Sequence, residues 1–205
     1  HKGFGGLSFN LTPEVYFDVT AGMFLGAGAD YNYQKQSLDY GAMINLVPAG
    51  GSFTVNASYA RIGNTVRNDI WYRLSTTKPY PAYVDLAKNY TDQADTAVVG
   101  VMFNITPEFQ LDANGSIVYS KGSFEAPAGT QTDAGKTFDM SLLPDYSKVD
   151  TVIATFSVGM SYDVSKDMLF SLSYLYENYM DNRDNGYNNF SGIAHAVYGG
   201  VGFKF

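Results

Sequence analysis

The sequence predicts an all-β protein, an antiparallel transmembrane β-barrel, and three observations lead to this expectation. Apolar and polar residues alternate along about nine segments, which is the period of a strand with one apolar face. Tight turns alternate with longer polar connections, as in barrels of outer membranes. The 205 residues include 17 Tyr, 14 Phe and 21 Gly, and aromatic residues gather near the ends of the segments.

Composition narrows the class further. No run of about 20 apolar residues exists, which excludes a membrane protein built of helices, whereas barrel strands dilute lipid-facing residues with lumen-facing ones. The chain has no cysteine, which excludes disulfides, thiolate metal sites and haem attachment of the Cys-x-x-Cys-His kind. A formal net charge of −7 argues against nucleic acid as a partner. Residues 1–205 are expected to form one barrel domain.

The first half of the chain is assigned by alternation and by its turns. After a short first strand, Thr12-Pro13-Glu14 forms a tight turn, because proline presets φ and cannot continue a ladder. The second strand is expected to run unbroken to Tyr33, since its odd positions stay apolar or aromatic. A short loop over 34–38 follows. Pro48-Ala49-Gly50-Gly51 then joins the third and fourth strands.

The second half of the chain repeats this pattern of alternating segments joined by tight turns. Thr106-Pro107-Glu108 copies the first turn and joins the fifth and sixth strands, and Ser165-Lys166-Asp167 joins the seventh and eighth. Long polar loops, expected to be extracellular, lie near 63–93, 121–148 and 180–192. Residues 69–74 in the first loop could prolong its strand above the membrane. The strands are expected over 3–11, 15–33, 39–47, 52–62, 95–105, 109–120, 149–163, 168–179 and 193–205.

The closing strand ends on an aromatic residue. Val197, Val201, Phe203 and Phe205 share one parity, with small or polar residues between them. This ending resembles the C-terminal recognition signal of Gram-negative outer-membrane barrels. The resemblance implies the bacterial outer membrane as location, lipid as surroundings, and the barrel-assembly machinery as a partner through the Phe205 strand.

Parity assigns the side chains to two faces. The lumen wall is expected to be small and neutral, with scattered acids and almost no Arg or Lys. It suits either a wide unselective channel or a sheath around another protein. The residues expected to face the lumen are Asp18, Thr20, Asn56, Ser58, Asp112, Asn114, Ser116, Ser157, Ser173 and Glu177. A lipid-facing girdle is expected from Tyr31, Tyr33, Tyr59, Phe103, Phe109, Tyr119, Phe170, Tyr174, Phe203 and Phe205.

Nine strands are an odd number, whereas bacterial single-chain barrels have an even number. An open edge in lipid would leave backbone groups unpaired. We therefore expect the C-terminal part of a larger even-stranded barrel; the alternative is an eight-stranded barrel with the first strand outside it. A soluble β-sandwich is the main competing fold, but it needs no aromatic residues at strand ends.

Local motifs offer no chemistry. His195 falls on the lipid parity near the outer end of the last strand and is expected to be interfacial. The segment from Asp181 is similar to a calcium loop, but Arg183 occupies a ligand position and Gly192 replaces the terminal Glu. We expect a solvated loop there, no metal site and no enzyme.

Three segments near the end resemble one family, the decahaem-associated outer-membrane barrels, which are the sheath component of porin–cytochrome conduits. The segments are Leu143-Pro144-Asp145, residues 158–167 and Ser173-Tyr174-Leu175-Tyr176-Glu177-Asn178-Tyr179. One departure is Asp181-Asn182, where the family often has Asp-Trp.

The resemblance implies a barrel that binds no cofactor itself and sheaths a multihaem cytochrome, the haem belonging to that partner, for electron transfer across the outer membrane. A general diffusion porin for small solutes, or a structural or adhesin barrel, remains open as an alternative.

Overall fold

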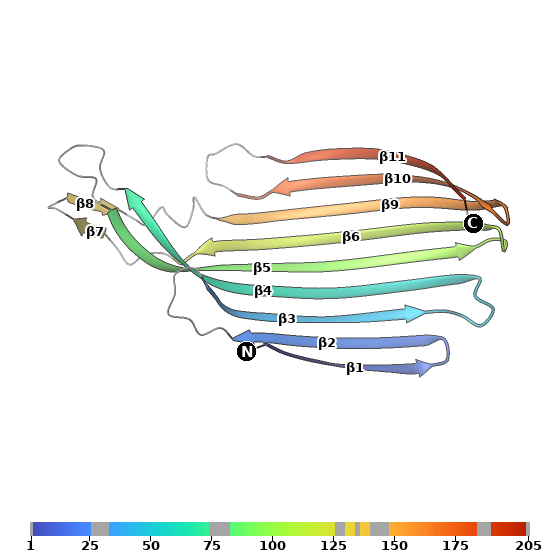
Figure 1. Ribbon diagram of the computed structural model, residues 1–205, viewed down its shortest axis with the longest axis horizontal. Helices are drawn as coiled ribbons and strands as arrows, with labels where there is room; N and C mark the ends of the chain where they lie inside the picture. The colour runs from blue at the N-terminus through green and yellow to red at the C-terminus, as the bar shows by residue number, and fades with distance from the viewer. Residues whose placement is uncertain are drawn as a thin grey trace.

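A computed structural model describes residues 2–25, 33–73, 83–125, 130–133, 136–139, 148–183 and 190–203. Nine antiparallel strands form one sheet in chain order, β1-β2-β3-β4-β5-β6-β9-β10-β11, and β7 and β8 form a separate small hairpin (Figure 1). The strands are β1 (Lys2–Thr12), β2 (Val15–Leu25), β3 (Tyr33–Leu46), β4 (Phe53–Arg73), β5 (Tyr83–Asn104), β6 (Phe109–Phe124), β7 (Thr130–Asp133), β8 (Lys136–Asp139), β9 (Val149–Ser165), β10 (Met168–Asp181) and β11 (Gly192–Phe203).

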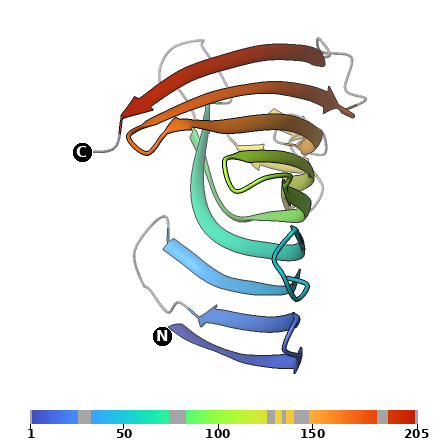
Figure 2. The ribbon, with the colours of Figure 1, turned by 90° about the vertical axis from the view of Figure 1, so that its right-hand side faces the viewer.

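The sheet is a single curved layer. Figure 2 looks along the strands from the end of the short turns and shows β1 and β11 at opposite edges. Within the described residues β1 pairs only with β2 and β11 only with β10, so the sheet is not closed. None of the large side chains that the structure describes is fully buried, and Leu7, Val197 and Val201 are 74%, 71% and 58% exposed. A soluble sandwich would bury such residues between two sheets, so the single layer argues against that alternative.

No helix in the described part of the chain is long and apolar enough to cross a membrane.

The connections differ in length at the two ends of the sheet. Short turns join β1 to β2, β3 to β4, β5 to β6 and β9 to β10, and all lie at the end marked by the C-terminus in Figure 1. The longer connections lie at the opposite end, where β4 and β5 project past their neighbours. This confirms the expected all-β antiparallel architecture, with nine strands in the main sheet.

The two Thr-Pro-Glu turns are closed by the threonine hydroxyl. Thr106 Oγ1 accepts hydrogen bonds from the backbone N–H of Phe109 at 3.1 Å and of Glu108 at 3.3 Å, and donates to Glu108 Oε2 at 3.0 Å. Thr12 Oγ1 accepts from the N–H of Glu14 at 3.3 Å in the same way. The turn before β4 instead depends on Gly50 and Gly51, whose φ angles of 97° and 63° favour glycine.

The long second strand expected from the sequence is wrong. β2 ends at Leu25, which pairs with Gln36 of β3, so the chain has reversed before Tyr33 opens β3. Residues 34–38, expected as a loop, therefore belong to a strand. Alternation alone could not mark this reversal, because residues of the same parity stay apolar or aromatic on both sides of it.

The expected loops also differ from the structure at their ends. Most of 63–93 is a hairpin, since β4 and β5 pair from Phe53↔Phe103 to Arg73↔Tyr83. β6 continues to Phe124, and the connection after it contains the β7–β8 hairpin. β10 continues to Asp181, which leaves a shorter connection before β11 than 180–192. Strands extend beyond the predicted span because paired backbones need no apolar face.

Candidate functional site

The register sorts the side chains of the sheet into two faces. One row of directly opposed residues reads Leu7, Val19, Ala42, Tyr59, Ala97, Ile117, Ala154, Asn178 and Ile193. The row beside it, on the opposite face, reads Ser8, Asp18, Met43, Ser58, Val98, Ser116, Thr155, Glu177 and Ala194. We call the first the apolar face and the second the polar face.

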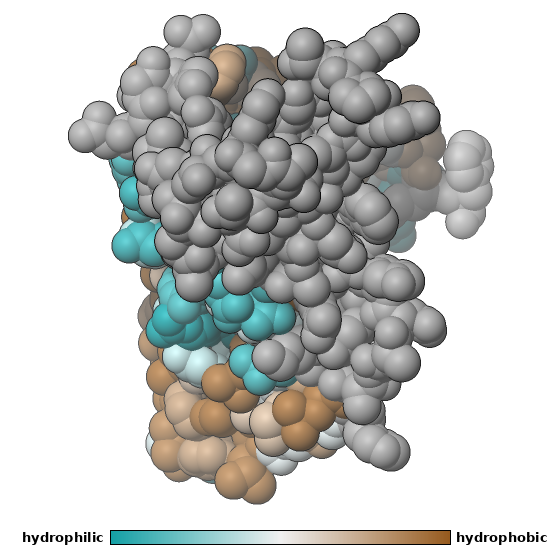
Figure 3. Space-filling view, turned by 90° about the vertical axis from the view of Figure 1, so that its left-hand side faces the viewer, coloured by the Kyte–Doolittle hydropathy of each residue, from teal (hydrophilic) through white to brown (hydrophobic). Residues whose placement is uncertain are grey.

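The apolar face carries a band of exposed hydrophobic residues with aromatic residues near its margins. At the turn end, Phe53 and Phe103 lie 6.2 Å apart between ring centroids, and Phe109 and Tyr162 lie 6.3 Å apart. Figure 3 views the opposite end, where hydrophobic surface covers the lower edge, formed by β1 and β2, and hydrophilic surface lies above it. Along β4, the stretch from Phe53 at this aromatic margin to the first charge, Arg61, is nine residues long with both ends counted, which is the length that a tilted strand needs to cross a bilayer.

The band climbs diagonally across the sheet. The aromatic pair at the turn end is Phe9–Phe17 on β1 and β2, but Phe53–Phe103 on β4 and β5 lies four residue pairs closer to the turn end in the register. Phe109–Tyr162 on β6 and β9 lies closer again. A band of even height that crosses the strands obliquely means that the strands are tilted, as in a barrel.

The polar margin of the band is closed by a cluster that joins three strands. Tyr59 donates a hydrogen bond to Asp95 Oδ1, Arg61 Nε lies 3.6 Å from the same carboxylate, and Gln93 Nε2 donates to its Oδ2 at 2.7 Å. Arg61 also reaches the Tyr40 hydroxyl at 3.4 Å. The sequence interpretation missed this cluster, although Arg61 and Asp95 interrupt the apolar parity of β4 and β5.

On the polar face, glycines make room for hydrogen-bonding side chains. A Cβ at Gly100 would lie 2.5 Å from Asn114 Oδ1 and 2.7 Å from Asn56 Oδ1, so the two amides lie over this glycine from both sides. A Cβ at Gly159 would lie 2.5 Å from Asp112 Oδ1. Asn114 Nδ2 donates to Asp112 Oδ2 at 3.3 Å. A polar track therefore crosses β4, β5, β6 and β9 close to the backbone.

Neighbouring residues of the polar row are also hydrogen-bonded to each other. Ser8 Oγ donates to Asp18 Oδ2 at 2.5 Å, and the hydroxyls of Ser116 and Thr155 form a hydrogen bond across β6 and β9. Ser157 and Ser173 follow the same parity beside Gly159. Many side chains of this wall are short and carry hydroxyl, amide or carboxylate groups, and apolar residues such as Met43 and Val98 lie among them.

The charge on the polar face has one sign. No lysine or arginine lies there among the strand residues whose side chains the structure describes. Seven acids do: Asp18, Asp39, Asp92, Asp112, Asp163, Glu177 and Asp181. The same part of the chain holds no group of three metal-ligating side chains.

Asp181 ends this series and forms an ion pair with Arg183. It is 4% exposed, and Arg183 donates to it from Nε at 2.8 and 3.0 Å and from a terminal nitrogen at 2.5 Å. These hydrogen bonds from Arg183 lower the pKa of the Asp181 carboxyl below its ordinary value. Arg183 therefore binds the carboxylate of Asp181. This ion pair lies in the segment that the sequence predicts only as a solvated loop.

His195 lies on the apolar face among tyrosines. Its Nδ1 is 2.7 Å from the Tyr174 hydroxyl, and its ring centroid is 5.4 Å from that of Tyr176. Such a cluster of amphipathic rings is typical of a membrane interface.

The register places all ten residues predicted for the lumen on the polar face. Of the ten girdle residues, seven lie on the apolar face: Tyr59, Phe103, Phe109, Tyr119, Phe170, Tyr174 and Phe203. Tyr31 and Phe205 lie outside the described residues, and only the backbone of Tyr33 is described. That the two faces meet lumen and lipid stays a prediction.

Comparison with known proteins agrees with this geometry. A sequence model of the outer-membrane β-barrel porins named MtrB/PioB matches residues 30–197. Among solved structures, the chain is similar to a protein described as the copper transporter OprC, with a TM-score of 0.59 and 13% identity. The match covers 98% of this chain and 33% of that one, so the chain spans about a third of the length of this neighbour. At this identity the likeness concerns the fold alone. No curated protein sequence matches.

Proposed function

The chain belongs to the MtrB/PioB family of outer-membrane β-barrel porins of bacteria, and from this premise we propose that its polar face lines a barrel that sheaths a multihaem cytochrome. The cytochrome would carry electrons across the outer membrane, and the barrel would hold it and keep lipid away from it. In this arrangement the protein is a conduit and catalyses no reaction itself.

The observation that supports the proposal most is the size and the chemistry of the side chains on the polar face. Gly100 and Gly159 leave no side chain of their own, and the neighbouring amides and carboxylate lie over them. Serine and threonine hydroxyls cover much of the remaining wall. Short side chains let a partner protein approach the sheet backbone closely, and hydrogen-bonding groups can pair with its polar surface. The apolar face meanwhile supplies the exposed hydrophobic surface that lipid requires.

The haem in this proposal belongs to the partner. The chain has no cysteine, so it cannot attach haem covalently through thioether bonds. Haem covalently attached to a polypeptide that follows the barrel through purification would therefore report a bound cytochrome.

The test is the visible absorbance spectrum of the native particle purified in detergent through a tag on this protein. We expect a strong Soret band that elutes with the barrel. Ser157→Trp, on the polar face at the middle of β9, should weaken co-elution of the haem, whereas Phe156→Trp on the apolar face should leave it unchanged. A flat spectrum from an intact preparation would contradict the proposal.

A second candidate is a water-filled diffusion porin, and the charge of the polar face favours it. Acids such as Asp18, Asp112 and Glu177, on a face whose described strand residues include no lysine or arginine, would attract cations and repel anions, as rings of acids do in cation channels. Under this alternative the haem-free barrel conducts in a planar bilayer and prefers cations. Asp112→Asn combined with Glu177→Gln should then lower the cation preference.

A further inference from the structure

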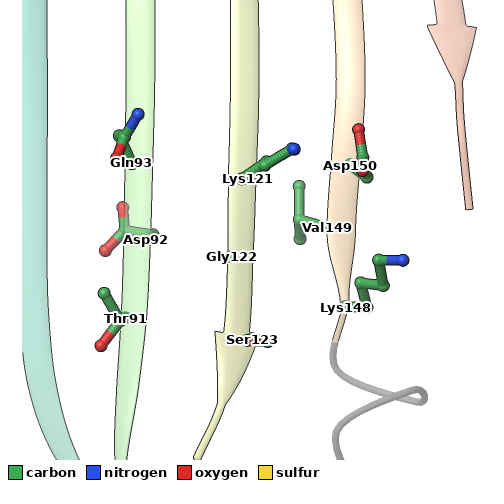
Figure 4. Close-up of a pocket in the computed structure, with 9 residues that line it drawn as sticks. All are labelled: Thr91, Asp92, Gln93, Lys121, Gly122, Ser123, Lys148, Val149 and Asp150. Carbon is green, nitrogen blue, oxygen red and sulfur yellow. The ribbon is translucent and has the colours of Figure 1, made fainter.

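A hollow opens at the polar margin of the apolar face, across β5, β6 and β9. It has a volume of about 520 Å³ and is lined by Thr91, Asp92, Gln93, Lys121, Gly122, Ser123, Lys148, Val149 and Asp150 (Figure 4). Its first pair, Gln93 and Lys121, lies two residue pairs beyond the row of Arg61, Asp95 and Tyr119, so the polar hollow begins where the apolar band ends.

Register shows on which side of the sheet the hollow opens. Gln93 is opposite Lys121, and Lys121 is opposite Asp150, all in the parity of Tyr119. On the other face, the Tyr90 hydroxyl lies 2.5 Å from where a Cβ of Gly122 would be, and Tyr90 does not line the hollow. The hollow is thus on the apolar face of the sheet, the side with the hydrophobic band.

Two lysines give the hollow its chemistry. Lys121 Nζ lies 4.9 Å from the centroid of the Tyr119 ring, a cation–π contact that holds the ammonium beside the last aromatic residue of the band. Lys148 is exposed immediately before β9. Within the described part of the chain neither lysine forms an ion pair. Thr91, Ser123 and Gln93 add hydroxyl and amide donors beside them.

We propose that this hollow binds the phosphate groups of the phosphorylated glycolipid in the outer leaflet. The inference requires that the long connections face outward, as barrels of this kind have them, and it does not depend on the cytochrome. Ammonium groups at the edge of a hydrophobic band meet lipid headgroups at the depth where phosphate lies. Acyl chains of the same lipid would cover the apolar band next to the hollow. Asp150 faces the same ligand and opposes its binding.

Direct binding to the full-length protein in detergent tests the site. Native mass spectrometry would compare lipid A with two phosphates, the same lipid with its phosphates removed, and inorganic phosphate. We expect the bisphosphorylated lipid to bind. At about fivefold for each lysine near a charged surface, Lys121→Gln with Lys148→Gln should weaken it by about 10- to 30-fold. Asp150→Asn should strengthen it.

Lys166→Gln is the matched control, because Lys166 lies in the turn at the opposite end of the sheet. It should leave binding unchanged, and heat-modifiable gel mobility should show that every variant is folded. Equal binding of the dephosphorylated lipid would overturn the proposal, as would an unchanged double variant. Displacement of the lipid by low concentrations of inorganic phosphate would assign the hollow to a soluble anion and would also overturn it. Haem co-elution is read separately, so either proposal can fail alone.

Discussion

The two faces of the sheet share one backbone and differ in what covers them. Ser157 and Val158 are neighbours on β9, yet the serine lies beside Asn114 on the polar face and the valine, 42% exposed, lies beside Ala113 on the apolar face. A globular sheet would bury the apolar side, and this one leaves it open to the surroundings. If the apolar face meets lipid and the polar face lines the lumen, as we propose, the stability of this fold depends on lipid, whereas its specificity resides in the opposite face.

A charge in the middle of each face tests this contrast most strongly. Val158→Arg should destabilise the folded protein by about 2–4 kcal/mol in lipid, the cost of arginine near the midplane of a barrel exterior. Ser157→Arg, one residue away, should cost much less because its side chain meets the polar wall. Urea unfolding in lipid vesicles measures both. Equal losses would show that the two faces do not differ in surroundings.

Glycines provide the next comparison. A Cβ at Gly41, on the polar face, would lie 2.9 Å from the backbone oxygen of Tyr59, whereas at Gly63, on the apolar face, its nearest contact would be 3.6 Å. Gly41→Ala should therefore cost about 1–3 kcal/mol through overpacking. Gly63→Ala should be close to neutral. The same unfolding measurement would contradict this reading of the packing if both variants behaved alike.

The buried ion pair gives a smaller, pH-dependent effect. Asp181→Asn should lower the free energy of unfolding near neutral pH, since it removes the charge that accepts the hydrogen bonds of Arg183. Because folding lowers the pKa of Asp181, the pair stabilises the protein above the ordinary aspartate pKa of about 3.9 and loses this contribution as the pH falls through the lowered value.

Thermal unfolding from neutral to acidic pH checks the sign of this effect. The difference between the native protein and Asp181→Asn should shrink at acidic pH. Arg183→Gln is the control for the partner. In a protein that carries this substitution, replacing Asp181 by Asn should change the melting temperature less than it does in the native protein. A difference that grew with acid would show that the carboxylate is not the stabilised form.

The exposed ion pair at the margin of the apolar face should matter least. The side chains of Arg61 and Asp95 are 36% and 21% exposed and lie 3.6 Å apart. Pairs this open to solvent contribute less than about 1 kcal/mol, so Asp95→Asn should have a smaller effect than Asp181→Asn. Chemical unfolding of the two variants side by side decides the order. A larger loss of stability for Asp95→Asn than for Asp181→Asn would show that the margin of the band is less exposed to solvent than we infer.

The sequence was sufficient to predict on which face of the sheet a side chain lies, but not where the strands end. A period of two is a local property, so the parity of Asn56, Asp112 or Ser157 could be read directly. The reversal of the chain after Leu25 could not be predicted in this way, since the alternation of apolar and polar residues can continue through a turn. The sequence predicts a loop for most of the outer halves of β4 and β5 because charged, polar and apolar residues are mixed there and prolines interrupt the stretch between them, and pairing of backbones leaves no trace in composition.

The candidate site shows the same limit. Its members were predictable one by one, but their neighbours were not, because register joins residues distant in the sequence. Asn56 and Asn114 meet over Gly100 only through the alignment of three strands. Lys121 and Asp150 became parts of one hollow through the pairing of β6 with β9. The one local sign of the polar margin of the apolar face was a charged residue, such as Arg61, at a position where the alternation calls for an apolar one.

The length of the β4–β5 hairpin has a consequence for encounters at the cell surface. Twelve residues separate Arg61 from Arg73, a reach of up to about 40 Å, compared with about 30 Å for the hydrocarbon of a bilayer. With the long connections outward, this ribbon would rise farther from the membrane than the membrane is thick. A large molecule arriving from outside, such as an antibody, a phage or a soluble redox partner, would then meet this ribbon, together with the β7–β8 hairpin at the same end of the molecule (Figure 1), before the other described strands.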